Sequence, residues 1–167
     1  HKAWQMLADN GILALGIPIH LNHPVDNAEW DHLQRRYDAI FVGVGAHRPR
    51  RLHIAGEELD GVLPGVSLLR QVNLAAYRQD GRGGRPAVGE RVIVIGGGNT
   101  AIDSAMVARR LGAKGVTVFY RRSRPEMLAN PWEIAEAEDE GVEFEYLVSP
   151  IRIRGDDKGR LIALECI

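Results

Sequence analysis

The sequence predicts an α/β fold, in which a Rossmann-like parallel sheet is flanked by helices and followed by a β-hairpin. After residue 90, apolar runs of strand length alternate with helical patterns, which is typical of strands laid parallel by helical crossovers. A glycine-rich turn separates the first of these strands from the helix that follows it. Near the end of the chain, the stretch from Gly155 to Gly159 divides two short strand patterns and indicates a hairpin.

The first 79 residues predict a less regular succession of elements. Asp26 is expected to cap a helix, because Asp is a preferred residue before the first helical turn. The continuous apolar run over 38–44 predicts a strand that is buried on both faces. In order, the expected elements are broken helical character over 3–15, a short strand over 17–22, a helix over 26–36, the strand over 38–44 and a helix over 66–78.

A Gly- and Pro-rich linker over 80–89 precedes the more regular part of the chain. Gly112 is expected to end the first helix of this part. Asn130, Pro131 and Glu133 predict a capping box, with proline in the first turn, at the start of the second helix. The expected elements are strands over 91–95, 116–120 and 142–148, helices over 99–111 and from 130 to 141, and hairpin strands over 151–154 and 160–166.

Length, charge and cysteine content narrow the functional classes. A chain of 167 residues suits one domain, or one domain with part of another. A net charge of -1 argues against a nucleic-acid partner, and no apolar run approaches the roughly 18 residues of a membrane span. Cys166 is the single cysteine, which fits a reducing, cytoplasmic location. Since both ends look cut, we expect a fragment of a longer protein.

The turn after the strand 91–95 fits a dinucleotide fingerprint. Gly96 permits the tight turn, Gly98 lets the backbone approach a pyrophosphate, and Ala101 in the third place sets how closely helix and strand pack. The helix that follows directs its unpaired N–H groups at the phosphates. A plain structural turn is the alternative. The candidate cofactor-binding residues of this turn are Gly96, Gly97, Gly98, Asn99, Thr100 and Ala101.

The end of the next strand indicates which dinucleotide is preferred. An NAD-binding unit usually carries Asp or Glu there, for the ribose 2′-OH. Here the strand runs into Arg121, Arg122, Ser123 and Arg124, and no carboxylate comes before Glu126. Guanidinium groups pair with a 2′-phosphate, whereas a carboxylate repels it. The pattern favours NADP(H), with Arg121, Arg122 and Ser123 as candidates, and a solvated basic loop is the alternative.

These residues also carry a resemblance to a known family. The stretch VIVIGGGNTAIDSAMVARRLGAKGVTVFYRRSRPEM, followed by EIAEAEDEGVEFEYL, closely resembles the NADPH-binding domain of the glutamate synthase small (beta) subunit family. These proteins are FAD-dependent pyridine nucleotide oxidoreductases. The upstream stretch YDAIFVGVGAHRPRRLHIAGEELDGV is similar to the segment in which the flavin domain crosses over to the NADPH domain.

The resemblance implies a two-dinucleotide-binding, disulfide-reductase-like flavoprotein architecture. In that family, hydride passes from NADPH to FAD, and single electrons then leave through iron–sulfur clusters. It implies that Gly96, Gly98, Asn99 and Thr100 hold the pyrophosphate, that Arg121 and Arg122 hold the 2′-phosphate, and that Gly45 and Ala46 lie near the flavin nucleotide site or a hinge. It further implies a partial FAD-domain segment with a crossover helix over 1–79, a linker over 80–89, and a C-terminally incomplete NADPH-binding domain over 90–167.

Departures from the family pattern limit what this chain is expected to do alone. No glycine fingerprint precedes Gly43, and the cysteine-rich region that holds iron–sulfur clusters is missing. We therefore expect NADPH as the cofactor here and FAD only in the full-length parent, with the isolated chain inactive and no catalytic residue within it. The expected partners are the rest of the flavin domain and an iron–sulfur acceptor domain or subunit. The alternative is a stand-alone NADP(H)-binding regulatory or interaction module.

Other side chains predict structural roles. His20 and His23 are placed on opposite faces of a strand, so we expect no metal site from them. Cys166 lies in an apolar strand and is expected to pack in the core. The acidic residues between Glu133 and Glu140 predict a solvated helix face, with a docking surface for a partner domain as the alternative.

Overall fold

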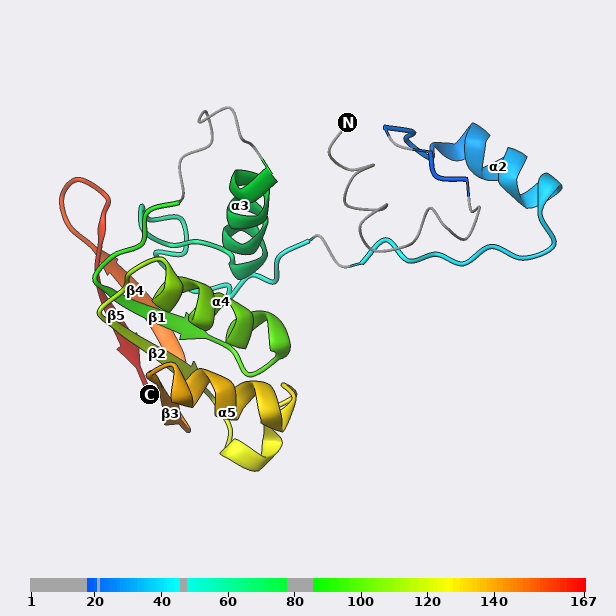
Figure 1. The fold of residues 1–167 in the computed structure, drawn as a ribbon. Helices are drawn as coiled ribbons and strands as arrows, with labels where there is room; N and C mark the ends of the chain where they lie inside the picture. Colours follow the sequence, from blue (N-terminus) through cyan, green and yellow to red (C-terminus); the bar gives the residue numbers. More distant parts are fainter. Residues whose placement is uncertain (1–17, 21, 46–47, 78–85) are drawn as a thin grey trace. The chain divides into compact units, whose positions relative to one another are not determined.

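The computed structural model describes residues 18–20, 22–45, 48–77 and 86–167, and every structural statement below concerns these residues. They belong to two compact units, 1–45 and 46–167, which are described one at a time. Figure 1 follows the chain through both units in sequence colours.

The first unit contains one described helix, α2 (Asn27–Arg36). The Asp26 carboxylate caps it by accepting a hydrogen bond of 2.9 Å from the Glu29 N–H, as the sequence predicts. The prediction of a strand over 38–44 is wrong: none of these residues is assigned to a strand, and Phe41 is 95% exposed. An apolar run becomes a strand only beside another strand, and the described part of this unit offers none.

Two further predictions fall in the first unit. The helical character over 3–15 lies outside the described residues. The strand predicted over 17–22 is not formed in its described residues, 18–20 and 22. Pro18 has no N–H to donate to a neighbouring strand, and Asn22 turns the chain away with a left-handed φ of 55°.

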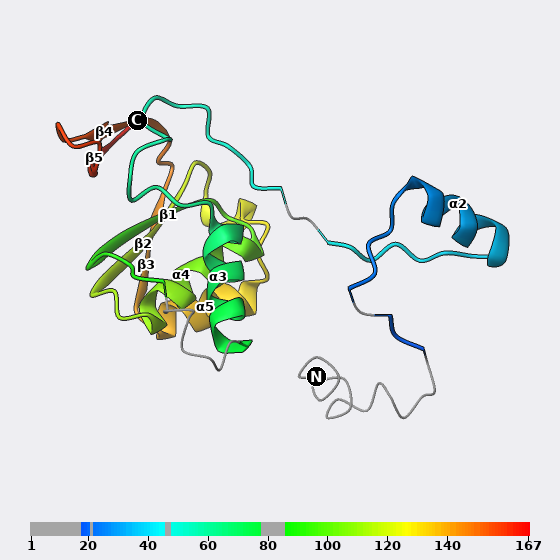
Figure 2. The ribbon, with the colours of Figure 1, turned by 90° about the horizontal axis from the view of Figure 1, so that it is seen from above.

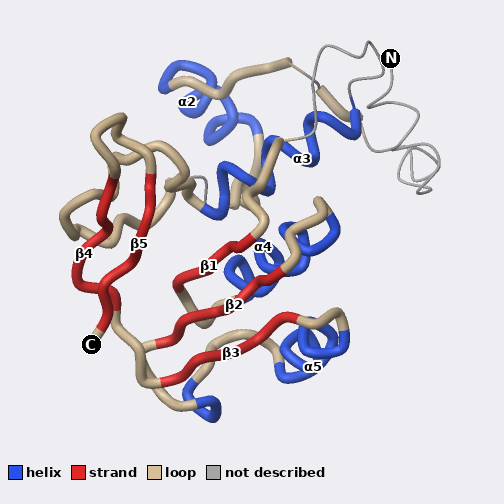
Figure 3. The backbone as a smooth tube through the Cα atoms, turned by 90° about the vertical axis from the view of Figure 1, so that its left-hand side faces the viewer, coloured by secondary structure: helices blue, strands red, loops and turns tan. Residues whose placement is uncertain are grey.

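The second unit is built around a three-stranded parallel sheet in the order β1-β2-β3. Helices α4 and α5 are its crossovers, and Figure 3 shows them beside the strands. This is the predicted parallel sheet with flanking helices. The elements are β1 (Arg91–Ile95), α4 (Asn99–Arg110), β2 (Gly115–Tyr120), the 3-10 turn η2 (Arg124–Glu126), α5 (Pro131–Asp139) and β3 (Val142–Tyr146).

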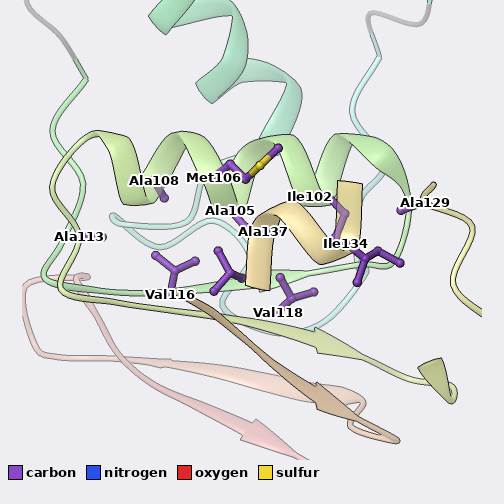
Figure 4. Close-up of a cluster of buried hydrophobic side chains, with 11 residues drawn as sticks. Ile102, Ala105, Met106, Ala108, Ala113, Val116, Val118, Ala129, Ile134 and Ala137 are labelled. Atoms are coloured by element: carbon purple, nitrogen blue, oxygen red, sulfur yellow. The ribbon is translucent and has the colours of Figure 1, made fainter. Parts of the chain in front are cut away.

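The core lies between the sheet and the two helices. Consecutive parallel strands joined by right-handed crossovers place both helices on one face. Alternate residues of β2, among them Val116 and Val118, are buried there, and Ile102 meets them from α4 with no exposed surface. Figure 4 shows these side chains pointing toward one another between helix and strand. Each such burial contributes about 1.5–3 kcal/mol, so the core fixes α4 on the sheet.

The ends of these elements lie within two residues of the predicted bounds. Gly112 ends α4 with φ of 105°, as predicted. The prediction of a capping box at the start of α5 is wrong. In a capping box the Glu133 side chain would accept the Asn130 N–H, but this N–H donates instead to the Asn99 side chain, at 3.1 Å. β3 stops at Tyr146, two residues earlier than predicted, where Leu147 adopts a φ of 61°.

Helix α3 (Gly65–Tyr77) packs against α4, and Figure 2 shows the two side by side. Their approach is close, since a Cβ on Gly65 would lie 2.7 Å from the Ser104 Oγ. The helix thus packs within the second unit, whereas the division into 1–79, 80–89 and 90–167 stays a prediction. Residues 86–89 of the predicted linker are loop, and 80–85 lie outside the described residues.

The predicted hairpin is formed by β4 (Pro150–Gly155) and β5 (Leu161–Cys166), which pair antiparallel in a separate sheet. Bridges from Ala55 to Arg152 and from Asp60 to Arg160 attach the segment before α3 to it. Cys166 is exposed, so its predicted place in the core is wrong. Both strands of a two-stranded sheet are edges, and an apolar pattern alone does not bury them.

Among the described residues, no helix is both long enough and apolar enough to cross a lipid bilayer.

Candidate nucleotide-binding site

Two glycines of the turn are required by the protein's own structure. Gly96 leaves β1 with φ of 142°, and a Cβ there would lie 3.3 Å from the Ala101 Cβ. A Cβ on Gly97 would lie 2.5 Å from the ring of Tyr120, at the end of β2. The tight turn and the close packing at Ala101 are therefore as predicted.

Gly98 differs from these two glycines. It is the N-cap of α4 with φ of -104° and ψ of 170°, a conformation open to any residue, and a Cβ there would meet nothing within 4 Å. Neither packing nor backbone strain explains a glycine at this position. A nucleotide phosphate that must approach the backbone does explain it, so the residues present fit the predicted ligand.

The first turn of α4 presents several hydrogen-bond donors. Its carbonyl at Gly98 accepts the N–H groups of Ala101 and Ile102, at 2.8 and 3.3 Å. The N–H groups of Asn99 and Thr100, which precede them, have no partner within the described residues. The Asn99 Oδ1 accepts from the Asn130 N–H, which leaves the Nδ2 amide protons of Asn99 as further donors.

Arg121 and Arg122 follow β2 directly, and both are exposed. Within the described residues neither guanidinium forms an ion pair with a carboxylate, although Arg122 helps to lower the pKa of Glu126. Arg124 differs, because it pairs with Glu138 in α5. The two arginines predicted to hold a 2′-phosphate are thus the ones whose charge is still available.

Ser123, the third candidate of this loop, already has a partner. Its N–H and its Oγ–H both donate to the Glu126 Oε2, at 3.0 and 2.7 Å. The hydroxyl bond from Ser123 is the main cause that lowers the pKa of Glu126. A direct role for Ser123 in nucleotide binding stays a prediction, and its visible role is to shape the loop.

The arginine loop, residues 121–124, and the segment that follows it are held beside the glycine turn at one edge of the sheet by hydrogen bonds. The Gly97 carbonyl accepts from the N–H groups of Leu128 and Ala129, at 2.8 and 3.0 Å, and the Tyr120 Oη donates to the Glu126 carbonyl at 2.7 Å. Because β1 and β2 are parallel neighbours, their carboxyl ends meet at this edge. The candidate residues from the two strand ends are thereby brought together.

Sequence reasoning missed two contributors to this edge, Tyr120 and Asn130, and it did not single out the interacting carboxyl groups of Asp103 and Glu133. Gly97 could have pointed to Tyr120, because the dinucleotide fingerprint needs no glycine at position 97 and the Tyr120 ring is what requires it. The pKa of Asp103 is raised, first by burial and then by the negative charge of Glu133. The Glu133 Oε2 is itself buried without a hydrogen-bond partner among the described residues.

The remaining sequence candidates lie elsewhere. The His20 and His23 ring centroids are 6.1 Å apart, and the His23 Nε2 lies 3.3 Å from a Glu29 oxygen. Within the described residues, no group of three His, Cys, Asp or Glu side chains converges as a metal site would require. Gly45 closes the first unit with a φ of 70°, and Ala46 lies outside the described residues.

Known proteins similar to this chain are oxidoreductases. Relatives include the beta subunit of NADP(+)-dependent formate dehydrogenase from Moorella thermoacetica, 41% identical over 93% of this chain and 21% of the relative. The beta subunit of NADPH-Fe(3+) oxidoreductase from Geobacter sulfurreducens is 42% identical over 82% of this chain and 20% of its own length. The chain therefore spans about a fifth of these relatives.

A glutamate synthase [NADPH] small chain from Escherichia coli is 34% identical over 92% of this chain and 33% of the relative. Among solved structures, the Mycobacterium tuberculosis oxidoreductase FprA matches with a TM-score of 0.62 at 20% identity. That match covers 99% of this chain and 55% of FprA, and it supports the fold. The family model for pyridine nucleotide-disulphide oxidoreductases matches residues 12–166, and the chain belongs to that family.

Proposed function

We propose that this chain is the NADPH-binding part of a flavin-dependent oxidoreductase like the glutamate synthase small subunit, which passes hydride from NADPH to FAD and then electrons to iron–sulfur centres. The observation that carries the proposal is that Arg121 and Arg122 are exposed and form no ion pair within the described residues, at the end of the strand next to the glycine turn. In that turn, no contact within the described part of the chain explains Gly98. A carboxylate would stand at this strand end in an NAD-binding unit.

The residues present would hold the two charged parts of the nucleotide. The N–H groups of Asn99 and Thr100 and the positive end of α4 would face the pyrophosphate. Arg121 and Arg122 would pair with the 2′-phosphate through charge-assisted hydrogen bonds. NADPH supplies a hydride when bound, while the chain contributes binding and orientation.

The wider assignment rests on the relatives. The three relatives are named for NADP(+) or NADPH, and the chain spans only a part of each. We therefore place FAD in the parent protein, with the rest of the flavin domain and an iron–sulfur domain or subunit as partners, and we propose that the isolated chain binds nucleotide without turnover. A cytoplasmic location rests on the single cysteine.

Titration calorimetry of the chain with NADPH and with NADH tests the proposal. Arg122→Glu should weaken NADPH binding by about 1.5–3 kcal/mol, or roughly 10- to 150-fold, because it removes a charged phosphate contact. NADH binding should stay within about twofold, since NADH lacks the 2′-phosphate. Lys158→Glu, the same charge change at the exposed hairpin turn, is the matched control.

The outcomes separate the two parts of the proposal. If the wild-type chain binds neither nucleotide, the cofactor assignment is wrong and an interaction module is favoured. Should wild type bind both with equal affinity, the role given to Arg121 and Arg122 is wrong, although nucleotide binding itself stands.

A further inference from the structure

Arg124 is the third arginine of the loop, and its charge is already in use. Its Nη1 donates to the Glu138 Oε1, and its Nη2 donates to the Oε2 at 2.7 Å, so the pair is bidentate. This bond is the main cause that lowers the pKa of Glu138 and raises that of Arg124. Arg121 and Arg122, three and two positions earlier, have no such ion pair within the described residues.

The pair joins two elements that are otherwise separate in the chain. Arg124 ends the arginine loop and begins the 3-10 turn η2, while Glu138 lies in the last turn of α5. Tyr146, at the end of β3, also helps to raise the pKa of Arg124, and its Oη is buried. The Arg124–Glu138 pair thus anchors the end of the loop to α5.

Other bonds hold the near end of the same loop. The Arg122 carbonyl accepts from the Leu147 N–H at 3.3 Å, and the Tyr120 carbonyl accepts from the Val148 N–H at 3.2 Å. Arg121 lies between these two bonds, and Arg122 carries one of them on its own carbonyl; both side chains are exposed. The backbone that carries the two available arginines is therefore restrained on both sides.

We propose that Arg124 is a positioning residue, whose bidentate pair with Glu138 fixes the loop so that Arg121 and Arg122 select a 2′-phosphorylated nucleotide. This inference rests on the proposed function. It divides three adjacent arginines into two that contact the phosphate and one that contacts the protein. The contrary assignment makes Arg124 a third phosphate ligand that leaves Glu138 when the nucleotide binds.

The two assignments predict opposite effects of removing Glu138. If Arg124 positions the loop, Arg124→Ala and Glu138→Ala should lower the selectivity equally, measured as the Kd for NADH divided by the Kd for NADPH. The expected loss is about three- to fivefold, the size of one partly exposed ion pair. If Arg124 binds phosphate, Glu138→Ala frees it and should raise NADPH affinity.

A charge swap provides the decisive variant. In Arg124→Glu/Glu138→Arg the ion pair is kept with its direction reversed, so selectivity should return to within about twofold of wild type. A direct phosphate ligand at position 124 would not tolerate glutamate, and the swap would then bind NADPH more weakly than Arg124→Ala. Glu140→Ala is the matched control, since it removes the comparable pair between Arg110 and Glu140 at the other side of α5.

Titration calorimetry with NADPH and NADH is run on all five proteins, with thermal unfolding as the test of folding. Equal losses in the two alanine variants, restored by the swap and absent in the control, support the inference. If wild type prefers NADPH and no variant changes that preference, or if the swap does not restore it, this inference is overturned while the proposed function stands. A wild-type chain without preference for NADPH overturns the proposed function and this inference together. If an alanine variant does not fold, Glu138→Gln takes its place with the same expected loss.

Discussion

Alanine at Gly97 and at Gly98 should have opposite consequences, although the two residues are adjacent. A Cβ on Gly97 would lie between 2.5 and 2.9 Å from three ring atoms of Tyr120. That ring is buried, and its Oη donates to the Glu126 carbonyl, so it has little room to move. A Cβ on Gly98 would meet no atom within 4 Å. The first change should therefore affect folding, and the second should affect ligand binding.

The magnitudes can be worked from these contacts. Overpacking costs about 1–3 kcal/mol, and displacing the Tyr120 hydroxyl from its acceptor adds about 1 kcal/mol, so Gly97→Ala should lose about 2–4 kcal/mol of unfolding free energy. Gly98→Ala exchanges a tolerated N-cap for a poor one, which costs about 0.5–1.5 kcal/mol. Alanine also restricts the unfolded chain more than glycine does, which stabilises the folded state by about 0.4–1 kcal/mol. The net change in the unfolding free energy of Gly98→Ala should therefore stay below about 1 kcal/mol.

Urea unfolding gives the stability of each variant, and calorimetric titration with NADPH gives its affinity. Gly98→Ala should weaken NADPH binding by at least about tenfold, because the new methyl group occupies the approach to the first N–H groups of α4. The reasoning is refuted if Gly98→Ala binds NADPH as wild type does. It also fails if Gly98→Ala unfolds as readily as Gly97→Ala, since the glycine would then be structural.

Three further predictions concern stability. Asp103→Asn should raise the unfolding free energy near pH 7 and leave it unchanged near pH 3. The folded-state pKa of this carboxyl is raised above 3.8, so its negative charge destabilises the fold only at a pH where it is ionised. A gain in stability that persists at low pH would contradict this cause. Arg109→Ala should cost about 2–4 kcal/mol in urea unfolding, since its guanidinium donates to the carbonyls of three residues, and Arg109→Lys should recover less than half. Gly112→Ala should lower the unfolding free energy by about 1–2 kcal/mol, because Gly112 has a left-handed φ and open space around it. Gly115→Ala, which also has open space but no left-handed φ, should leave the unfolding free energy nearly unchanged. Equal losses in the two variants would exclude backbone strain as the cause.

The sequence predicted best what is decided within a few residues. The strand, glycine turn and helix from 91 to 111 are as predicted, because periodicity, the turn residues and the helix start all lie within one short stretch. The meeting of the turn with Arg121 and Arg122 at one edge follows from the predicted parallel sheet, since parallel neighbours end on the same side. Local pattern and topology together were sufficient for both.

The failures have a common physical reason. The run 38–44 has the composition of a buried strand, yet burial depends on what lies beside it, and the described residues of its unit provide no paired strand. Cys166 lies in a strand that the sequence identified, but the number of strands in its sheet decided its exposure. The capping box at α5 failed because Asn99, 31 residues away, takes the Asn130 N–H. In each case a distant partner, or its absence, overrode the local pattern.

The arginine loop shows why the functional assignment needed the structure as well. Arg121, Arg122 and Arg124 carry the same side chain, and the sequence names only Arg121 and Arg122 of the three as candidates for the 2′-phosphate, without a physical reason to set Arg124 apart. Glu138 distinguishes them, because it lies 14 positions after Arg124 and is brought to it by the fold of α5 against the sheet. A bidentate ion pair neutralises the guanidinium charge that would otherwise attract a phosphate. If the proposed selectivity depends on which arginine the protein has already paired, removal of Glu138 should change it.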